Sequence, residues 1–234
     1  MSKNKLRDRL RKKQEELAKK GEGGGSFIFF KEGILRARPV YCGEDKEFAV
    51  EAIYFYLGPE IKGVVSPATW GDKCAIMKKY LALKNSGDED DKELSKSFSI
   101  KRRYFSPHIK YLDLKGKKID HEAGVKLACL TNGQYDGLIE LFLDDEQGDF
   151  THPKEGYDIK YKRTGSGMYD TVYSLVPCKP TKLDKKYIKK IYDPEEMLRK
   201  ETPSYKETKK YLKQFLNEEV SSKKKKKKKK SKDL

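Results

Sequence analysis

Two short stretches of the sequence interleave basic and aromatic side chains at the spacing of β-strands. They are residues 100–105 (IKRRYF) and 157–163 (YDIKYKR). Lysine and arginine attract phosphates and release counterions, while tyrosine and phenylalanine offer flat faces to unpaired bases at about 1 to 3 kcal/mol per base. This combination predicts a surface for single-stranded nucleic acid. The alternative is that both stretches are amphipathic strands whose charged edge simply faces water.

The charge of the chain is concentrated at its two ends. The sequence has 234 residues, 36% of them hydrophobic, and a formal net charge of +16. Residues 1–20 carry a net charge of +6 and residues 221–234 one of +8, which leaves +2 for residues 21–220. General attraction to polyanions therefore belongs mainly to the ends, and a specific surface must come from the arrangement of charges on the body.

The composition indicates a cytoplasmic protein. No run approaches the roughly 18 apolar residues of a membrane span, and the charged N-terminal segment has no apolar signal-peptide core behind it. The four cysteines lie far apart, and three of them fall in strand-like apolar segments, which is typical of reduced cysteine in a reducing compartment. No membrane partner is expected.

Hydrophobic periodicity predicts a mainly β protein with helices, in the α+β class. Two strands are expected within residues 27–57, and the others at 97–105, 108–114, 125–130, 156–163 and 169–176. Helices are expected at 72–84, with Asp72 as its cap, and at 134–143, 193–200 and 204–217. Residues 87–91 (GDEDD) predict an acidic, mobile loop. In the last strand Val172 and Val176 share one face, so Tyr169 and Tyr173 are expected to point outward.

Four segments follow from this organisation. Residues 1–25 form a basic arm, 26–180 the core, 181–220 a helical segment, and 221–234 a disordered polylysine tail.

Catalysis is not expected from these residues. His108, His121 and His152 are scattered without metal-ligand spacing, so neither a metal nor another cofactor is predicted. No nucleophile or phosphate-loop motif is present in the sequence. The carboxylates around Asp144 and Asp145 leave one enzymatic alternative, a metal-dependent nuclease.

The order of elements fits an OB-fold-like barrel of about five strands with helical insertions. Within it, a succession of motifs resembles the core of the single-stranded DNA-binding, helix-destabilising proteins of T-even-type bacteriophages. The motifs are ILRARP (34–39), residues 48–57, the 71–84 helix, KRRYFSPHIKYLDL (101–114), and GYDIKYKRTG (156–165) followed by Tyr169 and Asp170. The resemblance covers residues 1–180 and rests on the order of the motifs and on the basic arm in front.

The resemblance implies a protein that coats and protects unpaired DNA in replication, recombination and repair, with little sequence preference. It implies an OB-type cleft in which basic residues hold the backbone and aromatic residues contact the bases. By position, the implied DNA-binding residues are Arg36, Arg38, Lys101, Arg102, Arg103, Tyr104, Lys110, Tyr111, Lys160, Tyr161 and Lys162, joined by Tyr169 and Tyr173 from the last strand.

The resemblance also implies partners. The basic arm would mediate cooperative self-association along the DNA, the alternative being a merely solvated helix, and phage replication proteins are further expected partners.

Two departures from the family are visible. The family's zinc-binding loop has several cysteines and a histidine, whereas residues 64–80 offer only Cys74, so metal dependence is not carried over. The family's acidic C-terminal arm is replaced by polylysine at 223–230, which predicts added electrostatic affinity for DNA or for an acidic partner. The same charges also fit an RNA-binding or ribosome-associated module, which stays open as the alternative.

Overall fold

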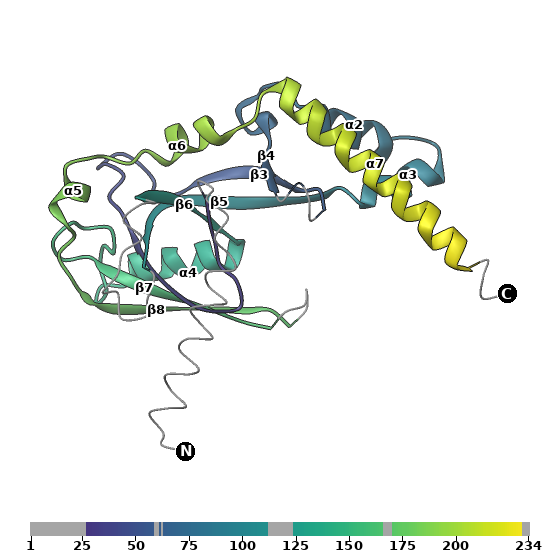
Figure 1. Ribbon diagram of the computed structural model, residues 1–234. Coiled ribbons are helices and arrows are strands. Elements are labelled where there is room, and N and C mark those ends of the chain that lie inside the picture. Colours follow the sequence, from purple (N-terminus) through teal and green to yellow (C-terminus); the bar gives the residue numbers. More distant parts are fainter. Residues whose placement is uncertain (1–26, 59–60, 62, 112–123, 166–169, 231–234) are drawn as a thin grey trace, which may run out of the picture. The chain divides into compact units, whose positions relative to one another are not determined.

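The computed structural model describes residues 27–58, 61, 63–111, 124–165 and 170–230, with only the backbone of 218–230. In these residues the chain is an α+β protein with eight strands and six α-helices, as the periodicity predicts (Figure 1). The strands are β1 (Phe27–Phe29), β2 (Gly33–Pro39), β3 (Val50–Tyr56), β4 (Gly63–Val65), β5 (Ser99–Lys110), β6 (Val125–Leu130), β7 (Tyr157–Thr164) and β8 (Val172–Pro180). The helices are α2 (Ala75–Lys84), α3 (Glu89–Lys96), α4 (Asn132–Leu143), α5 (Lys185–Ile188), α6 (Pro194–Glu201) and α7 (Tyr205–Lys230), with a 3-10 turn at Pro67–Trp70.

The chain divides into two compact units. The sheet unit contains Met1–Glu51 and Arg103–Lys200, and the helical unit contains Ala52–Arg102 and Glu201–Leu234. The sequence analysis instead expects one continuous core at 26–180 followed by a separate helical segment. The difference arises because α7 packs with α2 and α3, elements far away in the sequence, rather than with the helices that precede it.

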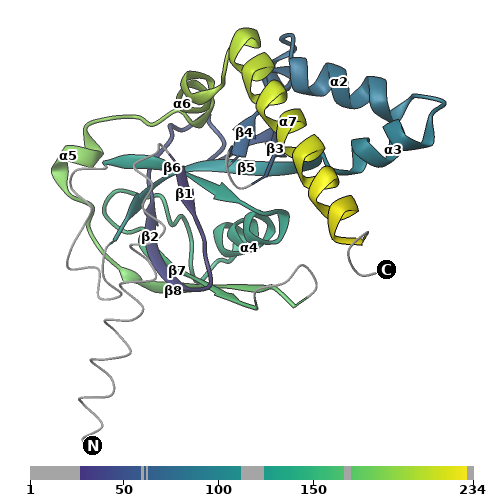
Figure 2. The same ribbon diagram turned by 45° about the vertical axis from the view of Figure 1, so that its right-hand side comes forward.

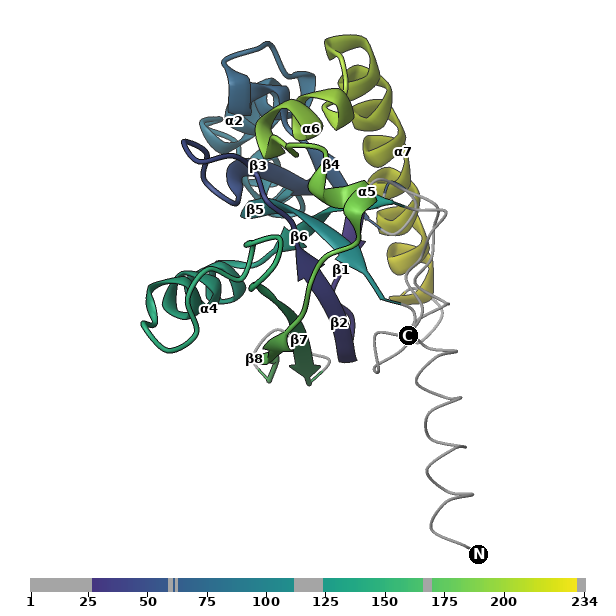
Figure 3. The ribbon, with the colours of Figure 1, turned by 90° about the vertical axis from the view of Figure 1, so that its left-hand side faces the viewer.

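The sheet unit contains a Greek-key arrangement of strands. Its hydrogen-bonded order is β1-β6-β5-β2-β7-β8, with β1 parallel to β6 and the other pairs antiparallel. Taking β2, β5, β6 and β7 as consecutive strands, the fourth returns to lie beside the first, which defines a Greek key. Figure 3 shows β2 between β7 and the β5–β6 pair.

The sheet is open rather than closed into a barrel. Among the described residues β8 pairs only with β7, and the outer edge of β6 is occupied by β1, where Phe27 is in register with Leu127. An edge strand presents unpaired backbone groups, and β1 satisfies those of β6 from the N-terminal side.

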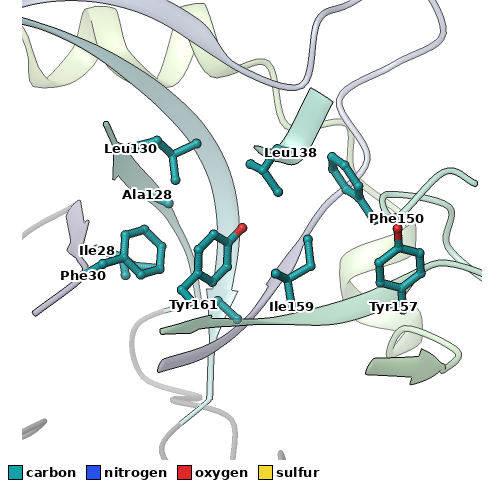
Figure 4. Packing of buried hydrophobic residues seen from close by; sticks show 10 residues of the cluster. Ile28, Phe30, Ala128, Leu130, Leu138, Phe150, Tyr157, Ile159 and Tyr161 are labelled. Atoms are coloured by element: carbon teal, nitrogen blue, oxygen red, sulfur yellow. The ribbon is translucent and has the colours of Figure 1, made fainter. Parts of the chain in front are cut away.

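One hydrophobic cluster fills the concave side of this sheet. Ile28, Ala128, Leu138 and Ile159 are buried in it, together with Tyr157 and Tyr161 of β7. Figure 4 shows the rings of Phe30 and Tyr161 side by side in this cluster, and their centroids are 4.2 Å apart. Helix α4 contributes Leu138 and begins with a capping box, in which Thr131 N donates to Gln134 Oε1 at 2.9 Å.

A second, smaller cluster lies on the opposite side of the sheet. Leu183 and Tyr187, from the segment around α5, pack on Val40 and Ile109. This segment therefore covers the outer side of β2 and β5 where those strands meet.

The helical unit is built around the pairing of α2, α3 and α7. Phe98 and Phe215 meet edge to face with centroids 4.8 Å apart, and Ile76 and Leu83 of α2 are buried in the same cluster. Figure 2 shows the ribbons of the three helices. The expected Asp72 cap of α2 is absent; instead the Ala75 N–H donates to Thr208 Oγ1 of α7 at 3.2 Å. A side chain from a distant helix thus satisfies a donor that the sequence assigns to a local cap.

Several predicted boundaries differ from the structure. The acidic stretch 87–91 includes the start of α3, where the Asp88 carboxylate accepts from Asp90 N at 2.7 Å. The strands expected at 97–105 and 108–114 are joined in one strand, β5, which ends at Lys110. It continues through Pro107, which is in register with Leu127 of β6 and whose carbonyl oxygen accepts from Val40 N at 3.1 Å. Helix α7 continues to Lys230, so the polylysine run is helical, since lysine has good helix propensity and elongation from a packed helix needs no new nucleation.

The basic arm at 1–25 lies outside the described residues. In the part of the chain that is described, every helix is too short or too polar to cross a membrane.

A glycine in β4 allows the closest packing in the helical unit. A Cβ at Gly63 would overlap the ring of Tyr54, and Tyr54 is 1% exposed. We expect Gly63→Ala to lower the free energy of unfolding by about 1 to 3 kcal/mol, because the buried ring has no room to move. Gly87→Ala is the matched control, because a Cβ at Gly87 meets nothing within 4 Å. Equal urea-unfolding midpoints for the two variants would contradict the packing assigned to Gly63.

Candidate nucleic-acid interface

Two of the predicted DNA-binding residues are buried and serve the fold instead. Arg38 is 0% exposed and Tyr161 is 2% exposed. A base cannot stack on Tyr161, because Phe30 and the core cluster surround it. A phosphate cannot reach Arg38 without unfolding the strands around it. The prediction that Arg38 and Tyr161 bind DNA is therefore wrong.

Arg38 ties β2 to two distant segments. Its Nη2 donates to the carbonyl oxygens of His152 and Thr181, each at 3.1 Å, and its Nη1 lies 3.8 Å from the buried carboxylate of Asp158. Burial lowers the pKa of Arg38, and the charge of Asp158 opposes that shift. A buried guanidinium is tolerated only when it is paired and hydrogen-bonded in this way.

Tyr161 shares a buried hydrogen bond with His108. His108 Nδ1 lies 2.9 Å from the carbonyl oxygen of Ser106, which can only accept, so Nδ1 carries the proton. His108 Nε2 must then accept from the Tyr161 hydroxyl, 2.7 Å away. Burial lowers the pKa of His108 to about 4 and raises that of Tyr161, so both groups are neutral at pH 7.

Arg36 and Tyr111 form a third constellation on the outer side of β2. Arg36 Nε donates to Asp158 Oδ2 at 2.7 Å, and its guanidinium lies 5.5 Å from the centroid of the Tyr111 ring. Burial, followed by the charge of Asp158, raises the pKa of Tyr111. Arg36 is thus already paired with a carboxylate, which reduces what it can offer to a phosphate.

The alternation of β7 places its lysines on the outer side of the sheet. Tyr157, Ile159 and Tyr161 point to the core, so Lys160 and Lys162 point away from it; Lys160 is half-buried and Lys162 is exposed. Their register partners are Arg36 and Ile34 on β2, and Val176 and Ser174 on β8. This outer face carries cations beside exposed aliphatic side chains, and Tyr111 is its one predicted aromatic residue among those described.

The basic run of β5 is divided between the two units. Lys101 and Arg102 are exposed and belong to the helical unit, while Arg103 and Tyr104 are half-buried and belong to the sheet unit. Tyr104 stacks on Tyr135 of α4, with ring centroids 3.9 Å apart and planes at 7°. One face of the Tyr104 ring is therefore occupied by Tyr135. Lys110, at the other end of the strand, is half-buried.

The last strand faces the other way from the prediction. Val172 and Val176 are the exposed residues, 62% and 47%, and Tyr173 is half-buried on the opposite side, with the Arg163 guanidinium 5.9 Å from its ring centroid. The reason is the register with β7, which pairs Tyr161 with Leu175 and so turns the odd-numbered residues of β8 toward the core side. Tyr169 lies outside the described residues.

Two aromatic residues that the sequence analysis does not select lie on the same side of the sheet as Arg103. Phe27 and Phe29 of β1 are in register with Leu127 and Cys129 of β6, on the side of the sheet opposite to the core. Phe29 is 42% exposed, and the Phe27 ring is 6.1 Å from that of Phe29. Cys129 is in register with Phe105, two residues from Arg103, and the Arg103 charge acts on the Cys129 thiol.

We call Phe27, Phe29 and Arg103 the aromatic face. The alternation in FIFF (27–30) is the local signal that separates Phe27 and Phe29 from the buried Ile28 and Phe30. Their placement on the same side of the sheet as Arg103 depends on the parallel pairing of β1 with β6, which no local pattern indicates.

The groups that could carry metal or thiol chemistry can be located among the described residues. They contain no group of three or more His, Cys, Asp or Glu side chains placed to hold a metal ion. Burial raises the pKa of Cys42 and of Cys129 to about 12, so neither is a thiolate at pH 7. Asp144, a candidate for the nuclease alternative, uses Oδ1 to accept from Glu146 N at 2.8 Å in a tight turn.

Comparisons with known proteins leave the family resemblance as a prediction. No protein-family model matches the chain, and no curated protein matches it.

The neutral His108 predicts a pH-dependent stability of the sheet unit. Its folded pKa of about 4 lies below its ordinary value of 6.5, so its contribution is full above pH 6.5 and is lost as the pH falls toward 4, because the unfolded chain takes up the proton first. The loss amounts to about 3 kcal/mol. We expect His108→Gln to be less stable than the natural chain at pH 7, by a difference that shrinks as the pH falls to 4.

His152→Gln is the control, because the His152 side chain is 44% exposed. Urea unfolding of the three proteins at pH 7 and pH 4.5 measures the effect. A stability difference for His108→Gln that stays constant between these pH values would contradict the assigned neutral state.

Proposed function

We propose that this protein binds single-stranded nucleic acid, with single-stranded DNA as its ligand, and that it does so without catalysis. The observation that carries the proposal is the aromatic face. An exposed phenylalanine, a second ring 6.1 Å from it and the Arg103 guanidinium share one side of the β1–β6–β5 sheet. Rings stack on unpaired bases, whose faces a duplex hides, and a cation beside them holds the connecting phosphate.

The order in which the strands of the sheet unit are connected supports the interpretation of this unit as an OB-type fold. An OB fold is a partly open, five-stranded Greek-key barrel, and it binds oligonucleotides on the face of its second and third strands. Counting β2 as the first strand, the five are β2, β5, β6, β7 and β8, with α4 between the third and the fourth. The second and third strands are then β5 and β6; the aromatic face takes Arg103 from β5 and its two rings from β1, which pairs with β6.

The outer face of β7 carries lysines that would bind the phosphates of the nucleic acid. Lys160 and Lys162 project from the side of the sheet that the core does not use. Ammonium groups hold the phosphate backbone without reading the bases, so this surface adds affinity and little sequence preference.

The wider biological role follows from the family resemblance and is part of the proposal. The protein would coat and protect unpaired DNA in replication, recombination or repair in a phage-like system, and neighbouring molecules would associate through the basic arm at 1–25. The helical polylysine run at the end of α7 would add electrostatic affinity.

The first test is a titration of single-stranded DNA, duplex DNA and RNA of matched sequence at several salt concentrations. We expect single-stranded DNA to bind most tightly, with an affinity that falls as salt rises. Equal affinity for single strands and duplex in moderate salt would overturn the proposal. A preference for RNA of identical sequence would select the RNA-binding alternative, and magnesium-dependent cleavage would select the nuclease.

The second test separates stacking from charge. Phe29→Ala should weaken single-strand binding about 5- to 150-fold, the equivalent of about 1 to 3 kcal/mol for a stacked base, with little change in the slope of log affinity against log salt. Lys162→Gln should lower that slope by about 0.7. The controls are Phe142→Ala, because Phe142 is 40% exposed on α4, and Lys154→Gln, an exposed lysine of the same unit. Equal affinities for Phe29→Ala and Phe142→Ala would remove the aromatic face from the interface.

A further inference from the structure

The segment that follows β7 and β8 holds a dense cluster of lysines. Residues 179–190, here called the lysine strap, contain six lysines and one acidic residue, Asp184, a net charge of +5. Residues 21–220 together carry only +2, so the rest of that span is net negative, at −3. The net positive charge of residues 21–220 therefore comes from this one short segment, because the cations elsewhere in that span are outnumbered by carboxylates.

Buried side chains and backbone hydrogen bonds attach the lysine strap to the rest of the sheet unit. Leu183 and Tyr187 are 6% and 5% exposed and pack on Val40 and Ile109. Thr181 N donates to Gly156 O at 3.0 Å, and Leu183 N donates to Pro153 O at 2.9 Å. These contacts alternate with the lysines along the segment, so the backbone is held while the charged side chains point outward.

The buried side chain of Arg38 also holds the strap in place. Its Nη2 donates to Thr181 O at 3.1 Å, and its Nη1 lies 3.4 Å from Thr181 Oγ1. The buried arginine that the sequence assigns to DNA thus positions a segment whose lysines are exposed. Figure 3 shows α5 within the segment that leads from β8 to α6.

The acidic member of the strap is used internally. Asp184 accepts from Lys186 N at 3.1 Å as the cap of α5. The exposed members are Lys179, Lys182, Lys185, Lys186, Lys189 and Lys190.

We propose that the lysine strap is a second nucleic-acid contact, which holds backbone phosphates and is indifferent to whether the bases are paired. The inference rests on the proposed function for the identity of its ligand. Exposed ammonium groups offer point charges to phosphates, and the one aromatic residue of the strap, Tyr187, is buried and cannot stack on a base. The strap therefore supplies affinity for single strands and duplex alike, while the aromatic face supplies the preference for single strands.

The test compares two variants of the full chain that lose the same charge. The strap variant replaces Lys182, Lys185, Lys189 and Lys190 by Gln and leaves Lys186, whose ammonium group lies 4.7 Å from the Tyr187 ring centroid. The control variant replaces four other exposed lysines by Gln, namely Lys73, Lys78, Lys96 and Lys154. Affinities for single-stranded and duplex DNA are measured between about 50 and 200 mM salt.

We expect the strap variant to lower the salt slope for single strands by about 3 and for duplex by a little more, while single-stranded DNA stays the more tightly bound of the two. The control variant should change either slope by less than one unit or so. Equal slopes for the two variants would overturn the inference. So would a strap variant that keeps its nucleic-acid slopes but loses binding to phosphatidylserine vesicles, because Ile191 is 68% exposed beside the lysines and a membrane surface would then be the ligand.

The two proposals fail separately. If the natural chain shows no preference for single strands but the strap variant still loses its duplex slope, the proposed function falls and the strap stands. If the preference is present and the two variants behave alike, the strap falls and the proposed function stands.

Discussion

The buried guanidinium of Arg38 is the constraint on which the sheet unit depends. A charge without water around it costs several kcal/mol unless it is paired and hydrogen-bonded. Arg38 Nη2 donates to carbonyl oxygens of two segments that are more than a hundred residues away in sequence, whereas its buried Nε has no hydrogen-bond partner among the described residues. These bonds fix the start of the lysine strap and the loop before β7 on either side of β2. Asp158, which pairs with Arg36 and faces Arg38, balances the charge and orients the outer side of the same strand.

The alternation of side chains along β7 determines which of its residues form the outer surface of the sheet. Because successive side chains of a strand point to opposite sides, burial of Tyr157, Ile159 and Tyr161 obliges Lys160 and Lys162 to face out. A shift of one residue would bury two ammonium groups and expose two core tyrosines, so the register is strongly determined. The hydrogen bond between His108 and Tyr161 adds a polar contact inside the core that only this register satisfies.

Within the proposed function, the described residues make two kinds of contact with nucleic acid, stacking and charge attraction. Phe27, Phe29 and Arg103 offer rings and a cation to an unpaired strand, whereas Lys160, Lys162 and the lysine strap offer charge alone. Stacking energy depends on access to the face of a base, and Coulomb attraction depends on the density of phosphates. A protein that supplies the two with different residues can hold a strand through its backbone and still distinguish unpaired bases from paired ones.

The sequence by itself determined the α+β class and the positions of β6 and α4, because these depend on local periodicity. It also placed the charge at the ends of the chain, which is a matter of composition. Tertiary structure decided which basic and aromatic residues reach the surface. Arg38 and Tyr161 lie in the same kind of basic and aromatic motif as residues that are exposed. Their burial depends on segments that fold over β2 and on Phe30 from the N-terminal part of the chain. The aromatic face and the orientation of β8 depend on the pairing of β1 with β6 and of β7 with β8. Strand partners and registers are set by contacts between distant residues, and a local pattern does not contain them.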